Sequence, residues 1–141
     1  MQAVEPADRV QRADAARLDR IAEAFASIVD TKSPFTARHS AGVADTAAGI
    51  ATTMGLDDAI QRLVRRAGLL HDVGKLGISN QILDKPTRLT DQEWRAVRHH
   101  PRLSLVIRRR VPALADVAQL AAMHHERLDG SGYPYGLVDD D

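Results

Sequence analysis

The chain has 141 residues, which is enough for one domain with a modest core. Its 19 basic and 19 acidic residues balance, so the charge gives no reason to expect a nucleic acid or an anionic membrane as partner. The chain has no cysteine, which excludes disulfides and thiolate metal sites, and any metal must be held by His, Asp or Glu. Without a membrane-spanning apolar run or a signal peptide, a cytoplasmic protein is expected. Aromatic residues are scarce at 4%, which favours an all-α fold.

In the first half of the chain, apolar residues recur every three or four positions, as they do along amphipathic helices. Phe25 and Ile28 belong to the apolar stripe of the first helix. Asp57 or Asp58 can cap the third, because a side-chain oxygen there accepts a hydrogen bond from the first helical turn. These helices are predicted over residues 7–29, 36–54 and 59–71.

The second half continues the helical pattern with clearer start and stop signals. Thr90 and Glu93 have capping-box spacing, which predicts a helix start at Thr90 that continues as far as His100. Pro101 then predicts a helix end or kink. Around these signals we predict a loop at residues 74–77, a helical turn at 79–83, an apolar helix at 103–107, a last helix from Pro112 to about residue 126, and a glycine-rich loop at 127–137.

These elements predict a helical bundle of about five to six helices. Residues 1–30 are assigned to an N-terminal helix or linker, and residues 31–141 to the domain. The break between them contains turn-forming residues and Pro34.

The most informative stretch is Leu69-Leu70-His71-Asp72-Val73-Gly74-Lys75. The leucines place the polar pair His71 and Asp72 at the buried end of a helix, where both side chains need partners. A divalent metal would satisfy both side chains, and a His-Asp hydrogen bond without metal is the alternative. Lys75 is either an ordinary solvated lysine or a cation that neutralises a metal-bound phosphate.

Further histidines stand on other helix ends, in segments otherwise rich in alanine and leucine. His39 shares a helix face with Val43 and Ala47, and it could also be a satisfied core residue. Together with the pair at residues 71 and 72, these histidines could hold two metal ions, with the carboxylate as bridge. Two metals about 3.5–4 Å apart are a common device for phosphoester hydrolysis. The remaining histidines of this set are His100, His124 and His125.

This set of residues resembles the HD superfamily of metal-dependent phosphohydrolases. The run His124-His125-Glu126-x-x-Asp129-Gly130-x-Gly132-Tyr133-Pro134 is similar to the signature of the HD-GYP family. The stretches at residues 73–78 and 82–86 are also similar to that family. The resemblance covers about residues 31 to 138.

The resemblance implies an all-α HD-domain-like fold, divalent metals that are commonly iron or manganese, and hydrolysis of cyclic di-GMP to pGpG and/or GMP by a metal-activated water. It implies catalytic roles for Lys75 and Asp72, and it favours His100 over His99 because the family's ligand directly precedes the proline. The implied metal ligands are His39, His71, Asp72, His100, His124 and His125.

The resemblance also assigns the glycine-rich loop a part in shaping the site and in contacting substrate or partner proteins, among them diguanylate cyclases with GGDEF domains. Glu126 and Asp129 have two alternative roles, which are to support the loop or simply to form a turn. The loop residues concerned are Asp129, Gly130, Gly132, Tyr133 and Pro134.

The chain departs from the family pattern in three respects. Phe35 stands where members with a third metal carry a glutamate, so two metals are expected. A further aspartate ligand, and the helices that bind substrate phosphates, come after the loop in the family, whereas this chain ends at residues 139–141. We therefore expect a domain that is incomplete at its C-terminus. The alternatives are a non-catalytic HD-type signalling or interaction module, and an HD phosphohydrolase of another nucleotide.

Overall fold

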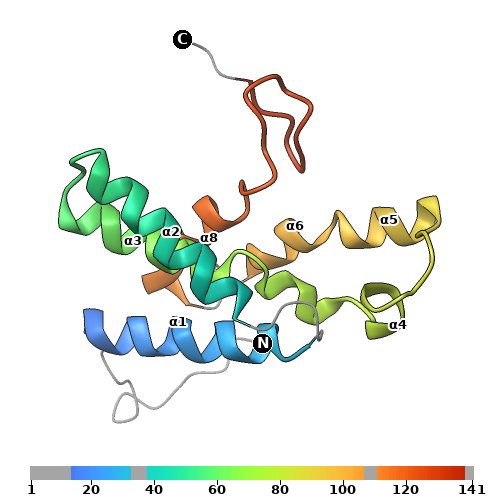
Figure 1. Ribbon diagram of the computed structural model, residues 1–141, viewed down its shortest axis with the longest axis horizontal. Coiled ribbons are helices and arrows are strands. Elements are labelled where there is room, and N and C mark those ends of the chain that lie inside the picture. Colours follow the sequence, from blue (N-terminus) through green and yellow to red (C-terminus); the bar gives the residue numbers. More distant parts are fainter. Residues whose placement is uncertain (1–13, 33–37, 107–110, 139–141) are drawn as a thin grey trace, which may run out of the picture.

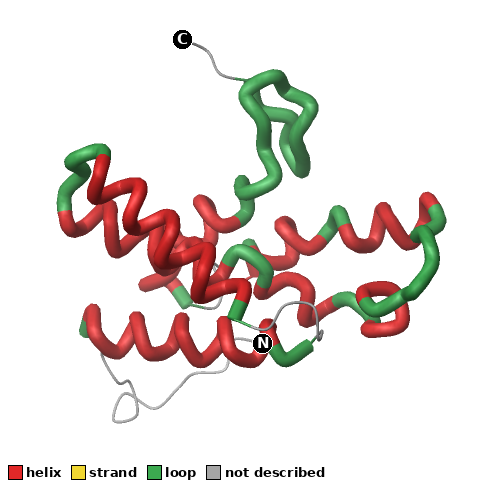
Figure 2. The backbone as a smooth tube through the Cα atoms, viewed as in Figure 1, coloured by secondary structure: helices red, strands yellow, loops and turns green. Residues whose placement is uncertain are grey.

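The computed structural model describes residues 14–32, 38–106 and 111–138, and this part of the chain is built from helices and loops (Figures 1 and 2). Within these ranges no strand forms, and one isolated β-bridge pairs Asp129 with Val138. The prediction of an all-α fold is confirmed. The elements are α1 (Ala15–Asp30), α2 (His39–Thr53), α3 (Asp58–Leu70), η3 (Val73–Gly77), α4 (Asn80–Leu83), α5 (Asp91–Val97), α6 (His100–Ser104), η4 (Pro112–Leu114) and α8 (Ala115–Ala121), where η marks a 3₁₀ helix.

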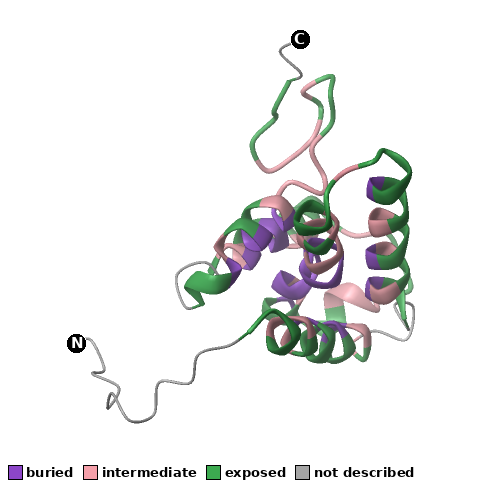
Figure 3. Cartoon of the chain, turned by 90° about the vertical axis from the view of Figure 1, so that its left-hand side faces the viewer, coloured by how far each residue is buried: buried purple, intermediate pink, exposed green. Residues whose placement is uncertain are grey.

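The core lies where α1, α2, α3 and α8 meet, and α2 and α3 run side by side (Figure 1). Small side chains allow this close packing. A Cβ added to Gly68 on α3 would lie 2.6 Å from the Cα of Ala44 on α2, so only glycine permits this crossing. Figure 3 shows the buried residues on the inward faces of these helices. The core cluster contains Ala22, Ala26, Ala44, Ala67, Leu69, Leu70, Leu114, Val117 and Ala121.

Two helix starts follow the predicted capping chemistry. Asp57 caps α3, with its Oδ1 accepting a hydrogen bond of 2.8 Å from the main-chain N–H of Ile60. Thr90 and Glu93 form the complete capping box of α5, in which each side chain bonds the backbone of the other residue.

The apolar stripe predicted for the first helix is only partly correct. α1 forms, and residues 7–13 of the predicted helix lie outside the described residues. However, Phe25 is 40% exposed and Ile28 54% exposed. The buried face is one of small residues, with Ala22 fully buried and Ala26 4% exposed. A helix packed this tightly against its neighbours can bury alanine more readily than phenylalanine.

Three details of the second half differ from the prediction. The loop expected at residues 74–77 is the 3₁₀ helix η3. The break expected at Pro101 lies between Val97, where α5 ends, and His100, where α6 begins. Pro101 itself lies in the first turn of α6, where a proline loses no intrahelical hydrogen bond. The last helix ends at Ala121 rather than near residue 126. Residues 107–110 lie outside the described residues.

The division into residues 1–30 and 31–141 stays a prediction. In the part of the chain that the structure describes, no helix has the length and apolar character needed to cross a membrane.

Candidate metal centre

The predicted metal ligands converge on the carboxylate of Asp72, which follows α3 and is 3% exposed. Its Oδ1 lies 3.3 Å from Nε2 of His100 and 3.8 Å from Nε2 of His124. Its Oδ2 lies 3.2 Å from Nε2 of His71 and 3.9 Å from Nε2 of His39. Each oxygen therefore faces a different pair of imidazoles, as expected for a carboxylate that bridges two ions.

The six side chains divide into two groups of three, and within each group the potential ligand atoms lie within 4.8 Å of one another. A nitrogen and an oxygen that each lie about 2.1 Å from one ion are themselves about 3 to 4 Å apart. The observed N···O distances of 3.2 to 3.9 Å fall in that range. The groups are His39, His71 and Asp72, and His100, His124 and His125.

Three of the imidazole rings are fixed by the same local hydrogen bond. In His71, His100 and His124, Nδ1 lies 2.6 to 2.7 Å from the main-chain oxygen of the residue three positions earlier. A carbonyl only accepts, so Nδ1 must carry the proton, which leaves the Nε2 lone pair of a neutral ring directed at the centre. The three carbonyls are those of Gly68, Val97 and Ala121, each in the last turn of its helix.

These tautomers make the centre short of positive charge. His100 and His124 place their Nε2 atoms 3.2 Å apart, and with both protons on Nδ1 the two lone pairs face each other. The Asp72 carboxylate adds negative charge beside them. Two lone pairs this close beside a carboxylate require a proton or a metal cation between them. Imidazole nitrogens and carboxylate oxygens are the atoms that divalent transition metals bind. The residues present therefore fit metal ions.

The pKa values show the same electrostatic balance. Burial alone raises the pKa of Asp72, but in the chain without metal the close contacts of His100 and His71 with its carboxylate outweigh burial and hold that pKa well below its usual range. Burial lowers the pKa of His71, yet the hydrogen bond and charge of Asp72 raise it further than burial lowers it. Burial, with the neighbouring histidines, lowers the pKa of His124 to about 3 and that of His125 to about 4. The rings of His124 and His125 are therefore neutral at physiological pH, which is the form that binds metal ions.

Lys75 lies on η3 and contributes a cation beside these groups. Its Nζ donates a 2.7 Å hydrogen bond to Oδ2 of Asp72, and its side chain is 24% exposed. The ammonium group therefore reaches both the carboxylate and solvent, which is not the position of an ordinary fully solvated lysine.

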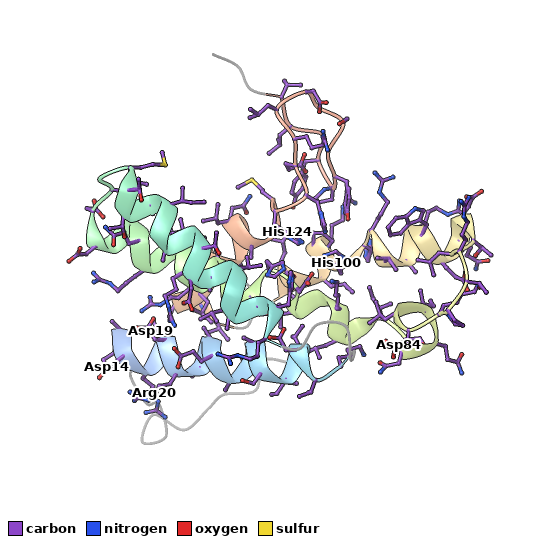
Figure 4. The ribbon with its side chains drawn as sticks, viewed as in Figure 1. Asp14, Asp19, Arg20, Asp84, His100 and His124 are labelled. Carbon is purple, nitrogen blue, oxygen red and sulfur yellow. The ribbon has the colours of Figure 1, made fainter. Side chains whose placement is uncertain are left out.

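Gly74 and Ser104 hold η3 against α6. The main-chain N–H of Gly74 donates a 3.2 Å hydrogen bond to Oγ of the buried Ser104. A Cβ on Gly74 would overlap the main-chain oxygen of His100. This close approach brings the α6 histidine to Asp72, whereas His99, the residue before it, is exposed. Figure 4 shows His100 beside His124, which follows α8.

The loop after the two histidines projects away from the bundle (Figures 1 and 3) and is tied together by two carboxylates. Glu126 accepts hydrogen bonds of 2.7 and 2.9 Å from the main-chain N–H groups of Tyr135 and Leu137. Asp129 accepts hydrogen bonds from the main-chain N–H and the hydroxyl of Ser131. Both residues thus stabilise the loop, and these bonds lower the pKa of Asp129.

Tyr133 connects this loop to the histidine cluster. Its ring stacks on His125, with 4.5 Å between centroids and a 20° interplanar angle, and the guanidinium of Arg98 lies 4.5 Å from its centroid. Arg102 also donates a 3.0 Å hydrogen bond to the main-chain oxygen of Pro134. The two arginines were not predicted from the sequence, where they are ordinary charged residues of a helical segment.

Glycines shape the loop at two predicted positions. A Cβ on Gly132 would lie 2.5 Å from both the main-chain nitrogen of Arg127 and the Cα of Glu126. Gly130 has a φ of 73°, in the left-handed region that favours glycine.

A largely apolar cavity of about 510 Å³ adjoins the histidines and lies between α2, α3 and the end of α8. His39, His71, His124 and His125 line it together with Val43 and Leu120. His39 and Val43 therefore face this cavity rather than the core, which corrects the alternative interpretation of His39 as a core residue. Phe35 and residues 139–141, on which the expected departures from the family depend, lie outside the described residues.

Comparison with known proteins identifies a family. Residues 23–141 match the family model described as HD domain. The chain is 48% identical over 128 residues to the 3'3'-cGAMP-specific phosphodiesterase 3 of Vibrio cholerae, covering 91% of this chain and 28% of the relative. It is 40% identical over 104 residues to a cyclic di-GMP phosphodiesterase of Thermotoga maritima, covering 72% of this chain and 28% of the relative. The cyclic di-GMP phosphodiesterase response regulator RpfG of Xanthomonas campestris is 35% identical over 135 residues, covering 93% of this chain and 34% of the relative.

The chain thus spans about a third or less of the length of these curated relatives. The resemblance to HD-GYP proteins that the motifs predicted is confirmed, and the chain belongs to the HD domain family.

Proposed function

We propose that this chain carries the metal-binding part of a phosphodiesterase that hydrolyses a cyclic dinucleotide. The observation that carries the proposal is the carboxylate of Asp72, which presents one oxygen to each of two histidine groups. We assign two divalent ions to these groups, with iron or manganese as the metals that suit a His/Asp donor set in this family. The ligands are His39, His71, Asp72, His100, His124 and His125.

When bound, divalent ions supply charge that polarises phosphoryl oxygens and acidifies water. Asp72 keeps its negative charge throughout, because its pKa is held well below the usual range. The water oxygen forms a bond to phosphorus, and the bond from phosphorus to one ribose oxygen breaks. A proton of the water passes to that ribose oxygen, and a linear dinucleotide such as pGpG is released. The Lys75 ammonium lies 2.7 Å from Asp72 and can donate to a phosphoryl oxygen as negative charge develops there.

Cyclic di-GMP is the substrate that we propose first, because relatives from two organisms carry that activity in their names. A second candidate is 3'3'-cGAMP, which is favoured by the 48% identity to a phosphodiesterase named for it. Both molecules contain the same two phosphodiester bonds, so the metal centre itself does not distinguish them.

We also propose that the loop residues Asp129, Gly130, Gly132, Tyr133 and Pro134 form a contact site for substrate or for a partner such as a diguanylate cyclase. The support is their position. The loop projects from the bundle, its Tyr133 ring stacks on a proposed ligand, and the neighbouring Leu137 is 45% exposed.

The first test is metal content per chain after anaerobic purification, compared between the wild type and Asp72→Ala. The expected result is close to two equivalents of iron or manganese in the wild type, and loss of both in the variant. Turnover of cyclic di-GMP and 3'3'-cGAMP to linear products is then followed by chromatography, with Asp72→Ala as the control. A correctly folded wild type that takes up neither metal would refute the proposal.

A further inference from the structure

The N-terminal end of α2 carries His39, and it has no capping side chain of its own. The residue before the helix, Arg38, has a φ of 60° and makes no side-chain capping bond. The first N–H groups of a helix need acceptors from outside the helix. At this position the acceptor comes from a different helix.

That acceptor is Asp30, the last residue of α1. Its Oδ1 accepts a 2.6 Å hydrogen bond from the hydroxyl of Ser40, and its Oδ2 accepts a 3.2 Å bond from the Ser40 main-chain N–H. Ser40 is fully buried and directly follows His39. The carboxylate thus accepts hydrogen bonds from both donors of Ser40, the residue next to a proposed ligand.

The placement of this aspartate is unfavourable for its own helix. A negative charge at a helix C-terminus opposes the helix dipole, whereas the same charge at a helix N-terminus is stabilising. Asp30 ends α1, with nothing basic in the last turn of that helix, and faces the start of α2. The Asp30 carboxylate therefore stabilises the start of α2 rather than the end of α1.

The position of His39 depends on the hydrogen bonds between Asp30 and Ser40, because its own ring has less support than the rings of the other proposed ligands. Rings of three other histidines are fixed through Nδ1 by a carbonyl, and His125 is stacked on Tyr133. Among the described residues, no comparable bond fixes Nδ1 of His39, and its side chain is 46% exposed. Its ring also meets the His71 ring edge-on, with 5.2 Å between centroids, so the start of the α2 backbone is one of the few constraints on its position.

We propose that Asp30 is a positioning residue of the metal centre, which acts through Ser40 to place His39 beside Oδ2 of Asp72. This inference rests on the proposed two-metal centre. It predicts that loss of the Asp30 carboxylate weakens the ion held by His39, His71 and Asp72 selectively. The ion held by His100 and its neighbours keeps its ligands.

The test loads the full chain with Mn²⁺ and measures bound metal after dialysis, metal affinity by calorimetry, and the spin coupling of a manganese pair by electron paramagnetic resonance. Wild type is expected to bind two ions and to show the coupled signal. Asp30→Ala is expected to bind one ion tightly, with at least a tenfold weaker second site and no coupled signal. Asp30→Asn keeps an oxygen that can accept both bonds, and it is expected to restore the second ion.

The matched control is Asp19→Ala. Asp19 also lies on α1 and also ties it to a neighbouring helix, through a 2.6 Å contact of its Oδ1 with Nε of Arg66 on α3. This variant is expected to lose stability but to keep both ions. Should Asp30→Ala fail to fold by circular dichroism, Ser40→Ala replaces it, with a smaller loss of second-site affinity expected.

Two ions bound with wild-type affinity by both Asp30→Ala and Ser40→Ala would overturn this inference alone. The same second-site loss in Asp19→Ala would also overturn it, because the effect would then be general to α1. A wild type that holds fewer than two ions would overturn the proposed centre, and this inference with it.

Discussion

Replacing Gly74 by alanine tests the link between helix packing and the metal centre. The added Cβ would lie 2.8 Å from the main-chain carbon of His100, besides overlapping its oxygen. Carbon atoms in contact normally stay about 3.5 to 4.0 Å apart, so η3 and α6 would have to separate by at least about 0.7 Å. That displacement would widen the 3.3 Å distance between Asp72 Oδ1 and His100 Nε2 to about 4 Å.

Overpacking of this kind costs about 1 to 3 kcal/mol of unfolding free energy. The assay is urea unfolding of the metal-free chain, followed by Mn²⁺ titration. Gly49→Ala is the matched control, because no atom lies within 4 Å of its added Cβ in the middle of α2. That control is expected to gain about 0.5 to 1 kcal/mol from helix propensity. If Gly74→Ala is as stable as the wild type and binds metal equally well, the argument that this glycine sets the distance between η3 and α6 is wrong.

Three further outcomes are expected. His100→Ala should lose bound metal, whereas His99→Ala, whose exposed side chain lies outside the cluster, should keep it in the same metal analysis. Hydrogen bonds led by that from Lys85 lower the pKa of Glu93 to about 2, so its stabilisation is present above pH 4.5 and is lost as the pH falls toward 2. Glu93→Gln should therefore be less stable than the wild type at pH 7, with the difference shrinking between pH 4.5 and 3 in urea unfolding; a constant difference would contradict this. Gly132→Ala should disrupt the loop, because the added Cβ would lie 2.5 Å from backbone atoms of Glu126 and Arg127. The fluorescence of the stacked Tyr133 should change, while the free energy of unfolding should change little.

The clustering of these His and Asp side chains could be predicted because they break a local pattern. Polar residues such as His71 and Asp72 stand in segments that are otherwise apolar, and burying them requires a partner. Helix starts were predictable for the same kind of reason, since the bonds of Asp57 and of Thr90 with Glu93 are made within three residues of the chain. The helical class follows from periodicity and composition alone.

Features that depend on distant contacts were not predictable. Asp30 resembles an ordinary turn residue in sequence, because its partner Ser40 lies beyond a break and on another helix. Arg98 lies 35 positions from Tyr133 in the chain, and no periodicity relates the two. The exposure of Phe25 also depends on packing, because hydrophobicity predicts that a helix has an apolar face but not which small residues will fit against its neighbours.

The histidine cluster is built on helix ends, and this explains how a short helical chain can bring so many imidazole rings together. The last carbonyls of a helix have no intrahelical donor. In His71, His100 and His124, Nδ1 donates to such a carbonyl, so one hydrogen bond both satisfies the helix terminus and fixes the tautomer of the ring. The ring then places its Nε2 within 3.2 to 3.8 Å of an Asp72 oxygen. A histidine in the middle of a helix would find the carbonyl three residues earlier already engaged, so the same rings could not be fixed in this way along a continuous helix.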